Sequence, residues 1–172
     1  MIARGGRRPP RAIGAWRRVM RRAGTASDSF KPGGGRCPYG LGMPTFSLTG
    51  IVVSDMARGL AFYRRLGLEI PAEADGEPHV EVTTPNGRLA FDTDDTIRSF
   101  DPSWRPGTGS PRLGLAFACA DPAEVDKAYA DLTGAGYTGE REPWDAFWGQ
   151  RYATVADPDG NHVDLFAPLA GA

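Results

Sequence analysis

Residues 148–166 read WGQRYATVADPDGNHVDLF, and this stretch decides the fold. Within it, Asp157-Pro158-Asp159-Gly160 predicts a tight turn, since proline fixes φ and glycine accepts a positive φ without steric cost. Side chains alternate along the strand that follows, so His162, Asp164 and Phe166 share one of its faces. The opposite face is apolar. The stretch therefore predicts a hairpin whose last strand has one core side and one side that bears titratable groups.

A second motif lies near the other end of the same domain. Val53-Ser54-Asp55-Met56 leads into Ala61-Phe62-Tyr63-Arg64-Arg65-Leu66-Gly67-Leu68, which predicts a strand and then a helix capped by Asp55 and ended by Gly67. The spacing recurs, because Tyr129 follows Asp121 by the same interval that separates Tyr63 from Asp55. The repeat predicts an α+β fold of two βαβββ units, at about 45–93 and about 111–168.

The expected strands follow from alternation and from turn residues such as Asn86-Gly87. They are 46–53, 69–72, 79–84 and 88–93 in the first unit, and 113–119, 137–142, 150–156 and 162–167 in the second. Between the units, 94–110 is rich in Asp, Pro, Gly and Ser, so we expect a loop there. Its aromatic residues Phe100 and Trp104 suggest that this loop folds over something.

The two motifs together resemble those of the vicinal oxygen chelate superfamily, over roughly residues 43–169. This superfamily includes glyoxalases, extradiol dioxygenases, fosfomycin-resistance thiol transferases and bleomycin-binding proteins. The resemblance implies two sheets that curve around a cavity, formed within one chain or between two chains that exchange units. It also implies a homodimer.

The resemblance further implies metal ligands at Leu48, near Ala90 (or at Asp92 if the register shifts by two residues), at Gly114 and at Asp164. Only Asp164 is a clear ligand type, since leucine and glycine side chains offer no donor. We therefore expect no metal cofactor. A divalent metal held by Asp164, His162 and Asp92 is the alternative, and His79 is expected to be an exposed edge residue.

The residues expected to bind a ligand are small or aromatic. Gly114 and Leu48 would face the cavity, where small neighbours leave space, and His162 and Asp164 would stand at or near its rim. A planar ligand could stack on the aromatic side chains, although each of these could equally fill the core or a dimer interface. The aromatic candidates are Trp104, Trp144, Phe147, Trp148 and Tyr152.

These features suggest metal-free binding and sequestration of a planar or cationic, drug-like molecule, as in the antibiotic-binding members of the superfamily. The alternative is an enzyme of the same superfamily, a lyase, isomerase, thiol transferase or dioxygenase. Such an enzyme would depend on a metal or use Asp164 as an acid/base with Tyr152 or His162. A regulator whose basic tail contacts nucleic acid is a third class, for which the acidic core is a poor match.

Charge is divided unevenly along the chain. Residues 1–42 hold ten of the 20 Lys and Arg residues and one of the 21 acids, a net of +9, which leaves a net of −10 from residue 43 onward. We expect 1–42 to be a disordered basic tail and 43–170 to be the folded domain. The two cysteines, of which Cys119 is expected to be a buried inert thiol, predict no disulfide framework and fit a cytoplasmic protein. No membrane or nucleic-acid partner is expected.

Overall fold

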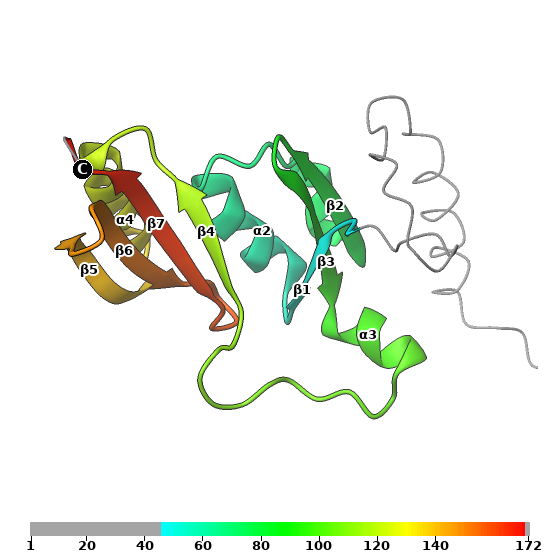
Figure 1. Cartoon of the computed structure of the whole chain (residues 1–172). Helices are drawn as coiled ribbons and strands as arrows, with labels where there is room; N and C mark the ends of the chain where they lie inside the picture. The colour runs from blue at the N-terminus through cyan, green and yellow to red at the C-terminus, as the bar shows by residue number, and fades with distance from the viewer. Residues whose placement is uncertain (1–45, 171–172) are drawn as a thin grey trace, which may run out of the picture. The chain divides into compact units, whose positions relative to one another are not determined.

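The computed structural model describes residues 46–170, and the compact unit considered below begins at Leu48. Its first half contains β1 (Thr49–Val53), α2 (Met56–Arg65), the 3₁₀ helix η1 (Ala72–Gly76), β2 (His79–Thr84), β3 (Gly87–Thr93) and α3 (Asp94–Phe100). The three strands form a sheet in the order β1-β3-β2 (Figure 1). Strand β1 pairs with β3 in parallel, and β2 pairs with β3 antiparallel.

The second half repeats this plan with one more strand. It contains β4 (Gly114–Ala118), α4 (Pro122–Gly134), β5 (Thr138–Ala146), β6 (Gln150–Ala156) and β7 (His162–Pro168). The sheet order is β4-β7-β6-β5, with β4 and β7 parallel and the other pairs antiparallel. In both halves the first strand lies beside the last, which confirms the predicted α+β architecture.

Helices α2 and α4 begin directly after Asp55 and Asp121, as the repeat in the sequence predicts. The Asp55 carboxylate accepts a hydrogen bond from the Arg58 N–H (2.8 Å), and Asp121 caps α4 through the Glu124 N–H (2.8 Å). Gly67 follows α2 with a φ of 84°. After α4 the residue with positive φ is Gly136, at 92°, and Gly134 is the last residue of the helix.

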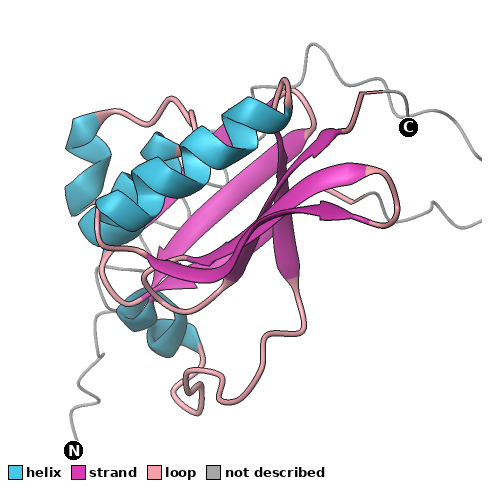
Figure 2. Ribbon diagram, turned by 90° about the vertical axis from the view of Figure 1, so that its left-hand side faces the viewer, coloured by secondary structure: helices cyan, strands magenta, loops and turns pink. Residues whose placement is uncertain are grey.

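One hydrophobic core joins the inner faces of the sheets to the helices. Alternate residues of β7 are buried, namely Val163, Leu165 and Ala167, as the alternation predicted. Helices α2 and α4 pack against each other on one side of the strands (Figure 2). Each fully buried large aliphatic or aromatic side chain stabilises the fold by about 1.5–3 kcal/mol. The largest fully buried side chains are Tyr63, Phe62, Phe91, Leu60, Leu132 and Leu165.

The strand predicted at 69–72 does not form. The Arg64 side chain instead donates to the carbonyl oxygens of Ile70 and Pro71, both at 2.8 Å, and to the Asp75 carboxylate. Pro71 has no N–H to give to a ladder, and η1 starts directly after it. The backbone carbonyls of this segment are therefore satisfied by a side chain rather than by a neighbouring strand.

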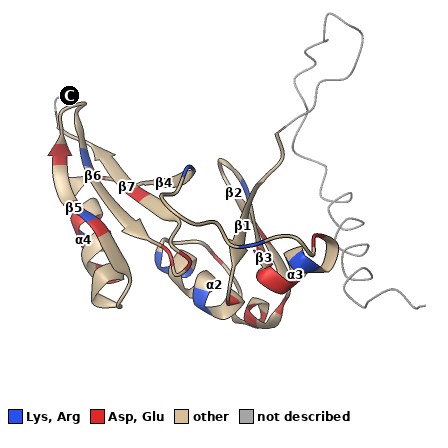
Figure 3. Cartoon of the chain, turned by 90° about the horizontal axis from the view of Figure 1, so that it is seen from below, with Lys and Arg blue, Asp and Glu red and all other residues tan. Residues whose placement is uncertain are grey.

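The segment predicted as a loop at 94–110 begins with the helix α3. The Thr93 side chain caps it by accepting from the Thr96 N–H (3.2 Å), and two acids, Asp94 and Asp95, occupy the first turn. Arg98 pairs with Asp94 at 3.0 Å one turn later, and both signs of charge are visible on α3 in Figure 3. The prediction missed these signals because the composition was typical of a loop.

The predicted basic tail at 1–42 lies outside the described residues. Between residues 46 and 170, no helix is long and apolar enough to span a membrane.

Candidate functional site

The two motifs that predict the fold meet through a buried hydrogen bond. The Tyr63 hydroxyl on α2 donates to the Asp157 carboxylate at the turn before β7, at 3.0 Å, and both residues are buried. Burial, followed by the charge of Asp157, raises the pKa of Tyr63 well above its usual value, so this hydroxyl stays a donor. The bond fixes α2 against the turn.

Asp157 also organises the turn itself. Its carboxylate accepts from the backbone N–H groups of Asp159 (3.0 Å) and Asn161 (2.8 Å) and from the Asn161 side-chain amide (2.8 Å). Gly160 adopts the positive φ, 85°, that the turn requires. These hydrogen bonds fix the turn. They therefore also fix which side chains of β7, from His162 onward, point to the core and which point to the opposite face.

Helix α4 packs against one face of the β4–β7 sheet, and we call the other face the open face. Backbone pairing places Asp164 between Ala116 and Thr154, with Phe166 beside Tyr152 in the next row. The β4 residues on this face are small and exposed to solvent. The open face consists of Gly114, Ala116, Ala118, Trp144, Tyr152, Thr154, His162, Asp164 and Phe166.

Asp164 stands in the middle of the open face with hydroxyl partners. The Thr154 hydroxyl donates to its carboxylate at 2.8 Å, and the Tyr152 hydroxyl bonds to the same carboxylate. Burial first, then this hydrogen bond and the charge of Asp164, raise the pKa of Tyr152 to about 12. No Lys, Arg or His within residues 46–170 forms an ion pair with Asp164. Its negative charge is therefore uncompensated.

Aromatic rings extend from Asp164 towards β5. The Trp148 ring meets the rings of Trp144, Phe147 and Tyr152 edge to face, with centroids 5.2, 4.9 and 5.5 Å apart. Tyr152 in turn stacks on Phe166 at 6.5 Å. The four aromatic residues predicted near β5 and β6 thus form one cluster. Phe166 belongs to it as well, and its position two residues after Asp164 on one strand could have identified it.

An arginine covers part of this cluster. The Arg141 guanidinium lies 3.9 Å from the centroid of the Trp144 ring. The pairing of β5 with β6 is irregular between Gly139 and Trp144, which is where a β-bulge re-aims side chains. One face of Trp144 is therefore occupied, and Trp148 and Tyr152 remain as the main surface for a ring.

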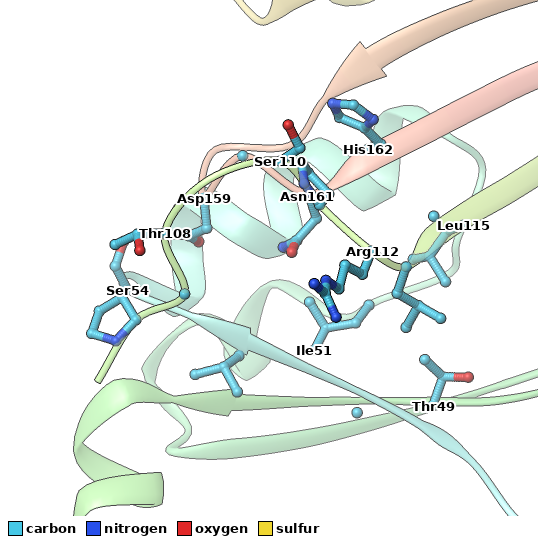
Figure 4. A pocket seen from close by; sticks show the side chains of 18 of the residues that line it. Thr49, Ile51, Ser54, Thr108, Ser110, Arg112, Leu115, Asp159, Asn161 and His162 are labelled. Carbon is cyan, nitrogen blue, oxygen red and sulfur yellow. The ribbon is translucent and has the colours of Figure 1, made fainter. Parts of the chain in front are cut away.

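A cavity of about 640 Å³ adjoins the open face (Figure 4). Its walls come from β1, from the linker 104–113, from the start of β4 and from the β6–β7 turn. Three of the predicted ligand-binding residues, Trp104, Gly114 and His162, line it. Leu48 and the cluster around Trp148 do not. The linker therefore forms a wall of the cavity, as the aromatic residues in it suggested.

Gly114 connects the cavity to Asp164. It lines the cavity, and a Cβ atom added to it would lie 3.7 Å from Asp164 Oδ2. The absence of a side chain at this position keeps the space beside the carboxylate open. The cavity and the open face are therefore neighbouring parts of one candidate site.

The alternative metal ligands Asp164, His162 and Asp92 do not form a metal site. Asp92 lies on β3, where its carboxylate bonds to His79 Nδ1 at 2.7 Å. In the described part of the chain, no three His, Cys, Asp or Glu side chains are grouped so that they could hold a metal ion. Leu48, Ala90 and Gly114 supply no side-chain donor. The residues present therefore do not fit the divalent metal that the resemblance implies.

His79 is not the exposed edge residue that the sequence suggested. Only 11% of its side chain is accessible, and it lies between Asp92 and Glu81, whose carboxylate is 3.5 Å from Nε2. The hydrogen bond to Asp92 raises the pKa of His79, an effect opposed by burial and reinforced by the charges of both acids. Burial raises the pKa of the half-buried Cys119 thiol, in keeping with the inert role predicted for it.

A family model described as Glyoxalase/Bleomycin resistance protein/Dioxygenase superfamily matches residues 45–165. No curated protein matches this chain.

Solved structures with the same fold come from several bacteria. A glyoxalase/bleomycin resistance protein/dioxygenase family enzyme from Burkholderia phytofirmans PsJN has a TM-score of 0.63 at 19% identity, covering 72% of this chain and 98% of its own. Lactoylglutathione lyase from Agrobacterium tumefaciens has a TM-score of 0.53 at 22% identity, covering 73% of this chain and 95% of its own. TioX from Micromonospora sp. ML1 has a TM-score of 0.51 at 19% identity, covering 73% of this chain and 100% of its own. At these identities the likeness concerns the fold alone.

Proposed function

This chain belongs to the glyoxalase/bleomycin resistance protein/dioxygenase superfamily, and we propose that it binds and sequesters a planar, cationic small molecule without a metal ion. One observation carries the proposal. Asp164, an acid with no cation partner within residues 46–170, lies beside a cluster of aromatic rings on the open face. A planar cation complements both features.

The physical basis of binding is burial of ring area together with one charge interaction. Ring stacking contributes about 0.5–1.5 kcal/mol beyond the apolar area that it buries. Thr154 and Tyr152 hold the Asp164 carboxylate in place, so little side-chain freedom is lost when a ligand cation approaches. Sequestration requires affinity and no reacting group, and the aromatic cluster with Asp164 supplies the contacts for it.

The proposal involves no metal. Three of the positions at which the resemblance implies ligands, Leu48, Ala90 and Gly114, carry no donor atom, and Asp92 is engaged by His79.

An enzyme of the same superfamily, a lyase, isomerase, thiol transferase or dioxygenase, is the competing function. In its acid/base form Asp164 would act together with Tyr152 or His162. Efficient proton transfer requires a pKa near the working pH, and the pKa of Tyr152, about 12, is far from neutrality. Tyr152 can donate a hydrogen bond there but is a poor base. This disfavours Tyr152 as the base of such a reaction.

Titration of the full-length protein with 9-aminoacridine, a planar cation, tests the proposal. Tryptophan fluorescence would report binding to wild type and to two variants, Asp164→Asn and Trp148→Leu. We expect each substitution to weaken binding about tenfold, because each removes a charge interaction or a stacked ring. The matched control is Asp126→Asn, which removes an acid that is already paired with Arg151 at 2.8 Å.

Two outcomes would contradict sequestration. Failure of wild type to bind 9-aminoacridine and other planar cations would remove its basis. Conversion of a bound ligand to a product, detected by mass spectrometry and lost in Asp164→Asn, would instead establish the enzymatic alternative.

We also expect a homodimer, as the resemblance implies. The Phe147 ring is 92% exposed and Leu113 is 69% exposed, so the described surface has apolar area to cover. Sedimentation velocity at several protein concentrations would measure the oligomeric state, and a monomer throughout would contradict the expectation.

A further inference from the structure

The cavity beside the open face contains one cation that the protein does not neutralise. Apart from Tyr63 and His162, its acidic and basic lining residues are Asp94, Arg112 and Asp159. Asp94 pairs with Arg98 at 3.0 Å, and Asp159 lies 3.6 Å from Arg58. No such pair involves Arg112 in the part of the chain that the structure describes. The cavity therefore keeps one positive charge.

The side chain of Arg112 points into the cavity. In Figure 4 its guanidinium lies between Ile51 on β1 and Asn161 at the β6–β7 turn. Asn161 is fixed there because its amide donates to Asp157 at 2.8 Å. Arg112 thus presents its planar donor fork to whatever occupies the cavity.

The neighbouring linker adds further donors. Gly107-Thr108-Gly109-Ser110 lines the same cavity, and its backbone N–H groups make no backbone hydrogen bond within residues 46–170. The Thr108 and Ser110 hydroxyls are on the same wall (Figure 4). Unpaired N–H and O–H donors that line the same cavity as a guanidinium suit an oxyanion. Ile51 and Leu115 supply apolar area for the body of the ligand.

We infer that this cavity binds a carboxylate group of the ligand, with Arg112 as its recognition residue. One guanidinium fork matches one carboxylate in both geometry and charge, whereas a phosphate monoester would leave one negative charge uncompensated. The inference rests on the proposed function and specifies its ligand class. With Asp164 available for a cation and Arg112 for a carboxylate, the ligand is a planar zwitterion.

Calorimetric titration of the full-length protein with three naphthalene probes tests the inference: 1-naphthoate, neutral 1-naphthalenemethanol and 1-naphthyl phosphate. We expect wild type to bind 1-naphthoate most tightly. Arg112→Gln should weaken 1-naphthoate about ten- to a hundredfold and leave the neutral alcohol unchanged, because only the charge-assisted bonds are lost. Arg112→Lys keeps the charge without the fork and should fall between wild type and Arg112→Gln.

The matched control is Arg105→Gln in the same linker. Arg105 donates to the carbonyl oxygens of Pro102 and Trp104 and does not line the cavity, so 1-naphthoate should bind this variant as it binds wild type. Equal affinity of wild type for 1-naphthoate and the neutral alcohol, tighter binding of the phosphate, or an Arg112→Gln variant with unchanged 1-naphthoate affinity would each overturn the inference.

Failure of the inference and failure of the proposed function give different results. If 9-aminoacridine binds and is sensitive to Asp164→Asn while 1-naphthoate is insensitive to Arg112→Gln, the binding function stands and the carboxylate site does not. If 9-aminoacridine fails to bind while 1-naphthoate depends on Arg112, the open face is not a cation site, and the carboxylate site stands alone.

Discussion

Asp92 and Asp164 lie on the last strands of the two halves of the fold, and they differ in whether a neighbouring side chain compensates their charge. Asp92 on β3 is 9% exposed and bonds to the imidazole of His79 at 2.7 Å. Asp164 on β7 is bonded by two hydroxyl groups and has no cation partner within residues 46–170. A carboxylate that is neutralised within the fold serves stability, whereas one that keeps its charge is available to a ligand.

The neighbours of each acid account for the contrast. Around Asp92, the side chains of His79, Glu81 and Arg88 form a chain of charge contacts of 2.7, 3.5 and 2.9 Å. Around Asp164 the corresponding neighbours are aromatic or small. Repetition of one topology therefore gives two carboxylates in similar sheets, and the residues on adjacent strands decide what each can do.

The largest predicted effect separates the two acids by stability. Asp92→Ala leaves the nearly buried His79 without its main partner, so we expect a loss of about 2–4 kcal/mol in the free energy of unfolding. Asp164→Ala leaves only hydroxyl groups that water can reach, so we expect a loss of about 1 kcal/mol in the free energy of unfolding. Urea unfolding of both variants and wild type at pH 6 gives the comparison.

A loss for Asp164→Ala equal to or greater than that for Asp92→Ala would show that the distinction between the two acids is wrong. Asp126→Ala, which affects an exposed acid on α4, is the control and should change stability by less than about 1 kcal/mol.

A smaller effect should appear in the pH dependence of stability. The pKa of His79 is raised in the folded protein, chiefly by its hydrogen bond to Asp92, so the folded state binds a proton more readily than the unfolded state. The resulting stabilisation is fully present below about pH 6.5, the usual pKa of unfolded histidine, and is lost as pH rises through the higher folded pKa. The difference in unfolding free energy between wild type and His79→Gln should therefore shrink from pH 5.5 to 9.

A His162→Gln background makes His79 the only histidine in the chain and leaves its titration unobscured. A difference that stayed constant or grew with pH would show that the pair near Asp92 carries no net charge interaction.

Much of the fold was predictable because its signals are local. The caps at Asp55 and Asp121 and the turn at 157–160 each depend on a few consecutive residues. The wrong predictions arose where the backbone conformation depends on a contact that the local sequence does not signal. Arg64 satisfies the backbone at Ile70 in place of a strand, and no nearby pattern announces that contact.

The candidate site was predictable only in part. Alternation placed Asp164 and Phe166 on one face. The pairing of His79 with Asp92 was predictable from the register of the hairpin. Thr84 and Gly87 flank the β2–β3 turn, and His79 lies five residues before Thr84 while Asp92 lies five residues after Gly87. The orientation of Arg112 could not, because a linker without regular structure has no periodicity from which to infer the direction of a side chain.

A modest effect should arise at the junction of the cavity and the open face. In Gly114→Ala the new Cβ would lie 3.7 Å from Asp164 Oδ2, an ordinary contact, so we expect little change in stability. The methyl group would nevertheless occupy space beside the carboxylate and should weaken 9-aminoacridine binding about three- to fivefold, roughly 0.6–1 kcal/mol.

Gly134→Ala at the end of α4 is the matched control, since a Cβ there would meet no atom within 4 Å and the residue does not line the cavity. Its affinity for 9-aminoacridine should equal that of wild type. Equal losses in both variants would mean that the space at Gly114 has no particular importance.

The smallest predicted effect concerns the hydroxyl of Tyr152. Tyr152→Phe removes one hydrogen bond to Asp164 and should cost about 0.5–1 kcal/mol of stability, because water can replace the lost donor at this half-buried site. The difference in phenolate absorbance between wild type and Tyr152→Phe, measured after rapid pH jumps, isolates one tyrosine that should ionise with a pKa of about 12. In an Asp164→Asn background this pKa should fall only part of the way to 10, since burial is the larger cause of the rise. A complete return to 10 would mean that the Asp164 charge alone controls Tyr152, and no change at all would mean that the two groups do not interact, which would remove the contrast with the His79 and Asp92 pair.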